Sequence, residues 1–182
     1  SEKRFVEPMK EWARLLQMSV PEIRRVAVDI EVRPSTANRM PNADEAADPI
    51  ITVAFAGSDG LRRVFLFDDR ETGEKVEEAP GADEVLMFET ERELIVETLR
   101  LIDDYPVVLT FNGDDFDFKY LRNRARNLGV GDVDIPITMG RRFAFLTNGV
   151  HIDLYQFFRN RSIQGYAFGN VYREFSLDDI TQ

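Results

Sequence analysis

The sequence predicts an α/β domain in which a mixed β-sheet is layered against helices. Strand-like segments come first, over residues 24–32, 50–56 and 63–67, and a helix–strand–helix succession follows over 91–128. That order is typical of layered α/β folds. Within the succession, Val107–Phe111 is short and apolar except for Thr110, as are strands buried on both faces of a sheet. A chain of 182 residues is long enough for one such domain and short for two.

The N-terminal part of the chain predicts a helix followed by a strand. Residues 7–18 carry apolar side chains at helical spacing, and Pro21 ends that helix. In Arg24–Val32, valine and isoleucine alternate with other residues, which is the pattern of a strand. We therefore expect an N-terminal helical segment over residues 1–22 that leads into a domain over residues 23–182.

Loops alternate with secondary structure in the middle of the chain. Residues 33–49 are rich in Pro, Asn, Asp and Ala and predict a loop. The Gly-Ser-Asp-Gly sequence at 57–60 is a hairpin signal between two β-rich segments. Residues 69–84 hold acids, two glycines and a proline, and predict an exposed loop. Glu91–Asp104 has one apolar face and predicts a helix, which Tyr105 and Pro106 break.

The C-terminal part predicts a second helix and three short strands. The helix extends from about Asp114 to Leu128, and Gly129 stops it. Further strand candidates lie near residues 135–139, 142–146 and 150–154, with a Thr-Asn-Gly turn at 147–149 before the last of them.

Composition and charge narrow the class of protein. The chain carries 23 basic and 33 acidic residues, a net charge of −10, which by itself disfavours contact with nucleic-acid phosphates. A nuclease that holds its substrate through divalent metals is the exception, because metals need carboxylate ligands. The chain has no cysteine, no apolar run that could span a bilayer and no signal-peptide pattern. The lack of cysteine fits an intracellular setting.

Asp29 and Glu31 are the first candidates for chemistry. They are two residues apart on a predicted strand, so their side chains point to the same face. Two adjacent acids are costly if buried without partners, and a divalent cation would remove that cost. The alternative is an edge strand whose acidic face is simply solvated.

A second acidic group follows the apolar strand that ends at Phe111. Ligands of α/β sheets bind at such carboxyl ends of strands. We interpret Asp114 and Asp115 as cap and first-turn acids of the next helix. Asp117 instead shares the core-facing side of that helix with Leu121 and Ala125, so it is either a metal ligand or another first-turn acid.

Basic residues and the single histidine have two possible roles each. A solvated helix face is favoured over phosphate contact for the arginines, which are Arg122, Arg124, Arg126, Arg141 and Arg142. His151 is interpreted as structural, with metal ligation as the alternative.

The chain resembles the 3′→5′ exonuclease domain of archaeal family B DNA polymerases. Val28–Glu31 resembles the first exonuclease motif of that family, and Thr110–Asp117 resembles the second, in a form typical of archaeal replicative enzymes. His151–Tyr155 matches a further segment that comes after the Met139–Phe143 region. The order and approximate spacing agree from Arg24 to Ile180.

The resemblance implies a ribonuclease H-like (DnaQ-like) fold and removal of mismatched 3′ nucleotides with two Mg²⁺ or Mn²⁺ ions. It implies that Asp29 bridges both metals, that Glu31 binds one and helps position the attacking water, and that Asp117 holds the second. It also implies that Asn112 supports the primer strand or the metal shell and that Phe116 packs near the terminal nucleotide. The partners would be the single-stranded 3′ end of primer DNA and the other domains of a DNA-directed DNA polymerase. The resemblance also implies a cytoplasmic, nucleoid-associated protein of a prokaryote.

The third motif of that family, Tyr-x-x-x-Asp, has no convincing counterpart. Phe175 and Asp179 have the spacing, but Tyr166–Ile180 better resembles a helix start that precedes the motif. We therefore expect a domain truncated before the third motif and weakly active or inactive alone. The alternatives are a free-standing 3′→5′ nuclease and a catalytically silent DNA-binding or scaffold module of the same fold.

Overall fold

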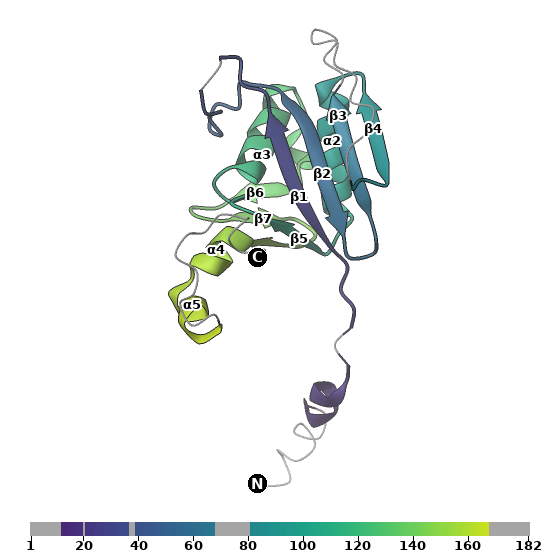
Figure 1. Ribbon diagram of the computed structural model, residues 1–182, viewed down its shortest axis with the longest axis vertical. Helices are drawn as coiled ribbons and strands as arrows, with labels where there is room; N and C mark the ends of the chain where they lie inside the picture. Colours follow the sequence, from purple (N-terminus) through teal and green to yellow (C-terminus); the bar gives the residue numbers. More distant parts are fainter. Residues whose placement is uncertain (1–11, 20, 37–38, 68–80, 168–182) are drawn as a thin grey trace.

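A six-stranded mixed sheet forms the body of the protein in the computed structural model, which describes residues 12–19, 21–36, 39–67 and 81–167 (Figure 1). The strand order is β4-β3-β2-β1-β5-β8. The strands are β1 (Arg25–Val32), β2 (Ile50–Gly57), β3 (Arg62–Phe67), β4 (Glu84–Phe88), β5 (Val107–Thr110) and β8 (Val150–Asp153). A separate two-stranded sheet pairs β6 (Ile137–Met139) with β7 (Ala144–Leu146).

The topology confirms a mixed sheet and brings three strand ends to one edge. β1 pairs antiparallel with β2, and β2 with β3, while β1, β5 and β8 run parallel. Ala27 of β1 is level with Leu109 of β5, so Asp29 and Glu31 extend past the end of β5. Thr110 is level with Asp153 at the end of β8. The turn after β5 therefore leaves the sheet beside Asp29.

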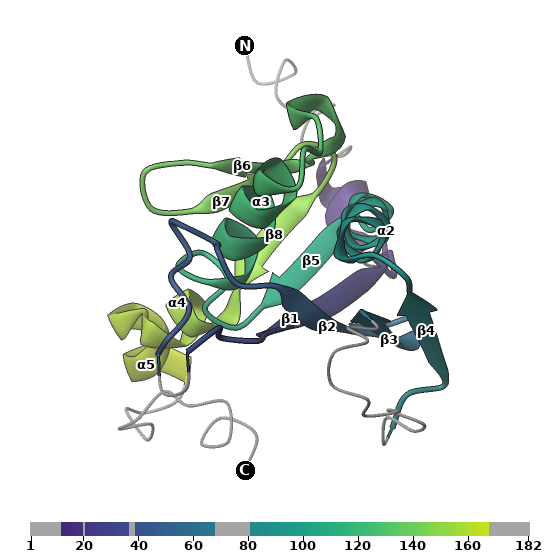
Figure 2. The ribbon, with the colours of Figure 1, turned by 90° about the horizontal axis from the view of Figure 1, so that it is seen from above.

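Two helices cover one face of this sheet (Figure 2). α2 (Glu91–Asp103) begins at Thr90, whose side chain and that of Glu93 form a reciprocal capping box. α3 (Asp117–Asn127) ends before Gly129, whose φ of +73° is a conformation that favours glycine. The core between the layers is fully buried and includes Val26, Ile50, Val53, Phe65, Leu94, Ile95, Ile102, Phe118, Tyr120 and Leu121.

A buried ion pair joins α2, α3 and the loop before β2. Arg124 donates to both carboxylate oxygens of Glu91, at 2.8 and 2.6 Å, and also to the carbonyl of Ala47 at 2.8 Å. Glu91 in addition accepts from the N–H of Ile50 at 2.8 Å. Arg124 is thus a structural residue, and the expectation of a solvated helix face is wrong for it.

Several boundaries differ from the prediction. α3 begins at Asp117 rather than near Asp114, because residues 113–116 form a turn. Val107 and Leu109 are only half-buried, so one face of β5 is buried rather than both. The sequence did not indicate β4, nor the short helices α4 (Leu154–Arg159) and α5 (Arg161–Ala167).

The remaining elements agree with the prediction where the structure describes them. The hairpin of β2 and β3, helix α2 and strands β6, β7 and β8 are confirmed. Residues 12–17 are helical, and the rest of the predicted first helix, with Phe175 and Asp179, lies outside the described residues. Among the described helices, none combines the length and the apolar character needed to cross a membrane.

Candidate active site

Asp29 and Glu31 lie on the face of β1 that the two helices leave open. The alternation of β1 buries Val26, Val28 and Ile30 on one side and turns both acids to the other. Although Asp29 faces solvent, neighbouring atoms remove enough water from its carboxyl to raise its pKa, against the lowering effect of the Ile30 N–H.

Asp117 is a buried acid at the first position of α3. Only 4% of it is exposed, and it shares its helix face with buried Leu121 and Ala125, as the sequence predicts. Burial, and next the negative charge of Asp29, raise its pKa to about 7. The charge of Asp153 acts in the same direction, whereas the N–H groups of Asp117 and Ile30 lower the pKa. The structure therefore brings Asp117 within electrostatic range of Asp29.

Glu31 does not complete a closed group with these two acids. Within the described ranges, no three or more His, Asp or Glu side chains are arranged to hold a metal ion. Glu31 lies two residues beyond Asp29 on the same face of β1. Of the three predicted ligands, Asp117 thus lies within electrostatic range of Asp29, and Glu31 shares the strand face of Asp29.

The turn between β5 and α3 carries the two residues assigned to substrate. Asn112 is half-buried and has a φ of +70°, a left-handed conformation that asparagine tolerates better than most residues. Its carbonyl accepts from the N–H of Phe116 at 2.9 Å, which closes the turn. Phe116 is the N-cap residue of α3 and packs on Tyr120, with ring centroids 5.5 Å apart.

Asp114 is not a helix cap, which corrects the prediction. Its carboxylate is buried and accepts from the N–H of Ala144 at 2.6 Å, and it lies 3.4 Å from Nδ1 of His151. Burial raises the pKa of Asp114, while the nearby His151 lowers it. His151 also contacts Thr110 Oγ1 at 2.7 Å, so the structural interpretation of this histidine agrees with its contacts.

Asp153 is the residue that the sequence interpretation missed. It is 6% exposed, and its carboxylate accepts backbone N–H bonds from Asn112 at 2.8 Å, Asp114 at 3.1 Å and Tyr155 at 2.9 Å. Its position at the end of β8, a strand parallel to β5, is the signal that could have found it.

Some basic residues form ion pairs, and others line a hollow at the surface. Arg126 pairs with Asp132 at 2.6 Å, on the surface. Arg122, Arg141 and Arg142 line a hollow of about 270 Å³ at the outer side of α3, together with Lys119, Asn123, Met139, Gly140 and the acids Asp44, Asp114 and Asp115. Lys119 pairs there with Asp44 at 2.7 Å.

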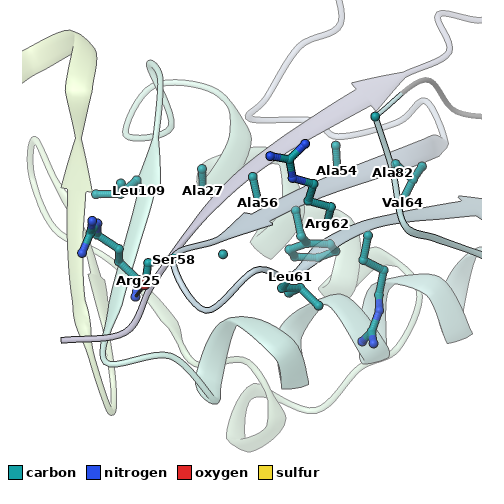
Figure 3. Close-up of a pocket in the computed structure, with 14 residues that line it drawn as sticks. Arg25, Ala27, Ala54, Ala56, Ser58, Leu61, Arg62, Val64, Ala82 and Leu109 are labelled. Atoms are coloured by element: carbon teal, nitrogen blue, oxygen red, sulfur yellow. Dashed lines mark hydrogen bonds between the residues drawn. The ribbon is translucent and has the colours of Figure 1, made fainter. Parts of the chain in front are cut away.

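A hollow lies on the open face of the sheet (Figure 3). It has a volume of about 510 Å³. Small side chains line its floor, namely Ala27 of β1 and Ala54 and Ala56 of β2. Arg25 and Arg62 stand at its sides. No carboxylate lines this hollow, so the hollow and the acidic residues occupy different parts of the open face.

The fold is ribonuclease H-like, and Asp117 and Asp153 lie at the carboxyl ends of its parallel strands, where α/β domains bind their ligands; this is the class of nuclease domains with that fold. Comparison with known families agrees with that class. Residues 5–171 match the model of the DNA polymerase family B exonuclease domain, and the chain belongs to that family.

Archaeal DNA polymerases are similar to nearly the whole chain. It is 40% identical over 173 residues to DNA polymerase 1 of Saccharolobus solfataricus, which covers 94% of this chain and 20% of the relative. It is 38% identical to DNA polymerase 1 of Sulfurisphaera ohwakuensis, over 99% of this chain and 20% of the relative. The corresponding enzyme of Aeropyrum pernix is 38% identical, over 97% of this chain and 18% of the relative. The chain thus spans about a fifth of the length of these curated relatives.

Proposed function

We propose that this domain is the proofreading 3′→5′ exonuclease of a replicative DNA polymerase and hydrolyses the terminal phosphodiester of a primer. The observation that carries the proposal is the buried Asp117 beside Asp29, at the carboxyl ends of β1 and β5, in a chain of this family. The substrate would be a single-stranded 3′ end, delivered by the remaining domains of the same polymerase. Such a substrate places the domain in the nucleoid region of the cytoplasm.

The chemistry of Asp29 and Asp117, a buried carboxyl near a second one, suits a hard divalent cation. A carboxyl whose pKa is about 7 is half protonated near neutral pH, and a hard cation is the partner that would hold it ionised. We assign Asp29, Glu31 and Asp117 as ligands of Mg²⁺ or Mn²⁺. When bound, such ions lower the pKa of a water and stabilise the leaving oxygen.

The residues of the chain perform the positioning. Asp117 must give up its proton before it can ligate, and the backbone N–H groups of Ile30 and Asp117 favour its ionised form. Asn112 and Phe116, fixed in one turn, would contact the primer strand and the terminal nucleotide. Because mismatched ends unpair at lower cost, the need for a single-stranded end favours their excision.

Substitution of Asp29 in the complete polymerase tests this function. Asp29→Ala should abolish release of a labelled 3′-mismatched nucleotide and leave nucleotide incorporation unchanged, because incorporation would use a different domain. Asp132→Ala, which removes an exposed carboxylate of the Arg126 pair, is the matched control and should excise normally. Excision by Asp29→Ala within a few fold of wild type would refute the function. A wild-type protein with no excision would instead identify a silent module.

A further inference from the structure

A carboxylate on the neighbouring strand holds the turn that carries the substrate residues. Both oxygens of Asp153 are engaged: Oδ1 accepts from the N–H groups of Asn112 and Tyr155, and Oδ2 accepts from the N–H of Asp114. Two of the three donors belong to the turn between β5 and α3, 41 and 39 residues away in the chain. Hydrogen bonds from N–H groups to an ionised acceptor are among the stronger ones in proteins.

The turn that Asp153 holds does not have a conformation the chain adopts freely. Asn112 has a φ of +70°, which costs free energy in a residue with a side chain. Gly113 is packed so tightly that an added Cβ would lie 2.2 Å from Thr110 Oγ1. Phe116, which ends the turn, has a φ of −128° and a ψ of −80° and no side-chain cap bond of its own. The contacts around the turn, rather than its local preferences, therefore determine its shape.

We propose that Asp153 is a positioning residue for 3′ excision, which fixes the 112–116 turn through the N–H groups of Asn112 and Asp114 and so sets Asn112 and Asp117 relative to β1. This inference rests on the proposed function. Asp153 would act through the backbone of the turn, because the hydrogen bonds of both its oxygens come from backbone N–H groups, two of them in the turn. The carboxyl ends of β5 and β8 are level at Thr110 and Asp153, which places the carboxylate directly beside the turn.

Asp153 also caps α4 through Tyr155, and one substitution separates the two roles. In Asp153→Ser the hydroxyl can still accept from the Tyr155 N–H, since serine is a good N-cap, but it is too short to bridge Asn112 and Asp114. In Asp153→Asn the amide oxygen can still accept from Asn112 and Tyr155, whereas the amide NH₂ would oppose the N–H of Asp114. The excision rate should therefore decrease from wild type to Asp153→Asn and again to Asp153→Ser.

The experiment measures single-turnover excision of a 3′-mismatched primer by the complete polymerase as a function of Mn²⁺ concentration. Asp153→Ser should lower the excision rate by about 10- to 100-fold and raise the half-saturating Mn²⁺ concentration severalfold, because Asp117 is displaced. Asp153→Asn should show a smaller loss of the same kind. Incorporation should change little, the variants should stay folded at the assay temperature, and Asp132→Ser, the same substitution on the surface, should behave as wild type.

The outcomes separate this inference from the function on which it rests. Wild type and Asp29→Ala are measured first, and equal excision by the two would remove the proposed function itself. With that function intact, excision by Asp153→Ser within about twofold of wild type overturns the positioning role. An equal loss in both variants with an unchanged Mn²⁺ dependence also overturns it, because that result points to general destabilisation. If Asp153→Ser unfolds at the assay temperature, the Mn²⁺ dependence of Asp153→Asn decides.

Discussion

At the scale of single residues, the buried carboxyl of Asp117 destabilises the folded protein, and metal binding would explain why the fold contains it. Because this carboxyl is only 4% exposed and lies near the charge of Asp29, both desolvation and repulsion disfavour its ionised form. Within the described residues, no basic side chain is among the main groups that shift its pKa. The nearby donors are backbone N–H groups, which offset only part of the cost. A divalent cation would supply the missing positive charge.

The pH dependence of stability should report this cost directly. Folding raises the pKa of Asp117 from 3.8 to about 7, so in between the folded state holds a proton that the unfolded chain has released. The stability contributed by this group is therefore fully present below the unfolded pKa and is lost as pH rises through about 7. Without divalent metal, the Asp117 carboxyl should lower the free energy of unfolding of the wild-type protein by about 2 kcal/mol between about pH 5.5 and pH 8. In Asp117→Asn this contribution should be absent.

Urea unfolding of wild type and Asp117→Asn at the two pH values is the measurement. The comparison between the proteins cancels other titrating groups, among them His151, whose pKa burial lowers. Asp132→Asn provides a surface control with an unchanged pH profile. Parallel profiles for wild type and Asp117→Asn would contradict a raised pKa for Asp117.

Residues of this site differ in how far a sequence can reveal them. The helical period predicts that Asp117 faces the core, because Leu121 and Ala125 recur at the same face. The strand period predicts that Asp29 and Glu31 share a face. Asp114 and Asp153 act through contacts with Ala144, His151 and the turn, from segments about 30 to 40 residues away. No local pattern contains such contacts, so Asp114 was assigned to a helix cap.

At the scale of elements, the turn between β5 and α3 depends on one glycine. A Cβ at Gly113 would lie 2.2 Å from Oγ1 and 2.5 Å from Cβ of Thr110, which is buried and β-branched and cannot move aside. Gly113→Ala should therefore displace the turn, with a loss of 3′ excision of more than about 10-fold and unchanged incorporation. Gly131→Ala is the control, since its Cβ would meet only Asp134 Oδ2 at 3.2 Å. Normal excision by Gly113→Ala would contradict the close packing of Gly113 against Thr110.

The ion pair between α2 and α3 should be structural rather than a phosphate contact. Arg124→Met leaves Glu91, whose side chain is 8% exposed, as an uncompensated buried charge, and should lower the free energy of unfolding by about 2–4 kcal/mol. Adding Glu91→Met should recover part of that loss. Arg126→Met, from the exposed pair with Asp132, should not change stability measurably.

Urea denaturation measures these differences, and DNA binding distinguishes the two roles of Arg124. At a temperature where the variant stays folded, Arg124→Met should keep wild-type affinity for single-stranded DNA. A folded Arg124→Met variant with strongly weakened binding would restore the phosphate-contact interpretation.

Long elements, in which the hydrophobic pattern repeats several times, were predictable from the sequence, and short elements were not. The amphipathic pattern of α2 and the alternation of β1 and β2 extend over enough residues to define the element and its buried face. β4 has five residues and lies next to an acidic segment, so its pairing with β3 leaves no clear pattern. α4, with six residues, begins at an Asp cap whose other contacts are tertiary.

At the scale of the whole molecule, a net charge of −10 disfavours contact with DNA phosphates, and bound divalent cations would offset that repulsion. Since no closed group of three acidic or histidine ligands forms within the described residues, metal binding by residues 1–182 alone should be weak. Titration calorimetry with Mn²⁺ should give a dissociation constant of about 1 mM or weaker, and excision should be slow. Micromolar binding, with excision as fast as that of the complete polymerase, would show that this chain holds the whole site.

The most direct test of the central claim is a crystal structure of the polymerase with Mn²⁺ and a 3′-terminal nucleotide, analysed by the anomalous scattering of manganese. The claim is that Asp29, Glu31 and Asp117 hold the catalytic metals at the ends of β1 and β5. We predict anomalous peaks within about 2.5 Å of carboxylate oxygens of Asp29 and Asp117, with Glu31 turned toward one of them. Peaks confined to other carboxylates, or a terminal nucleotide bound away from Asp29, would contradict the claim.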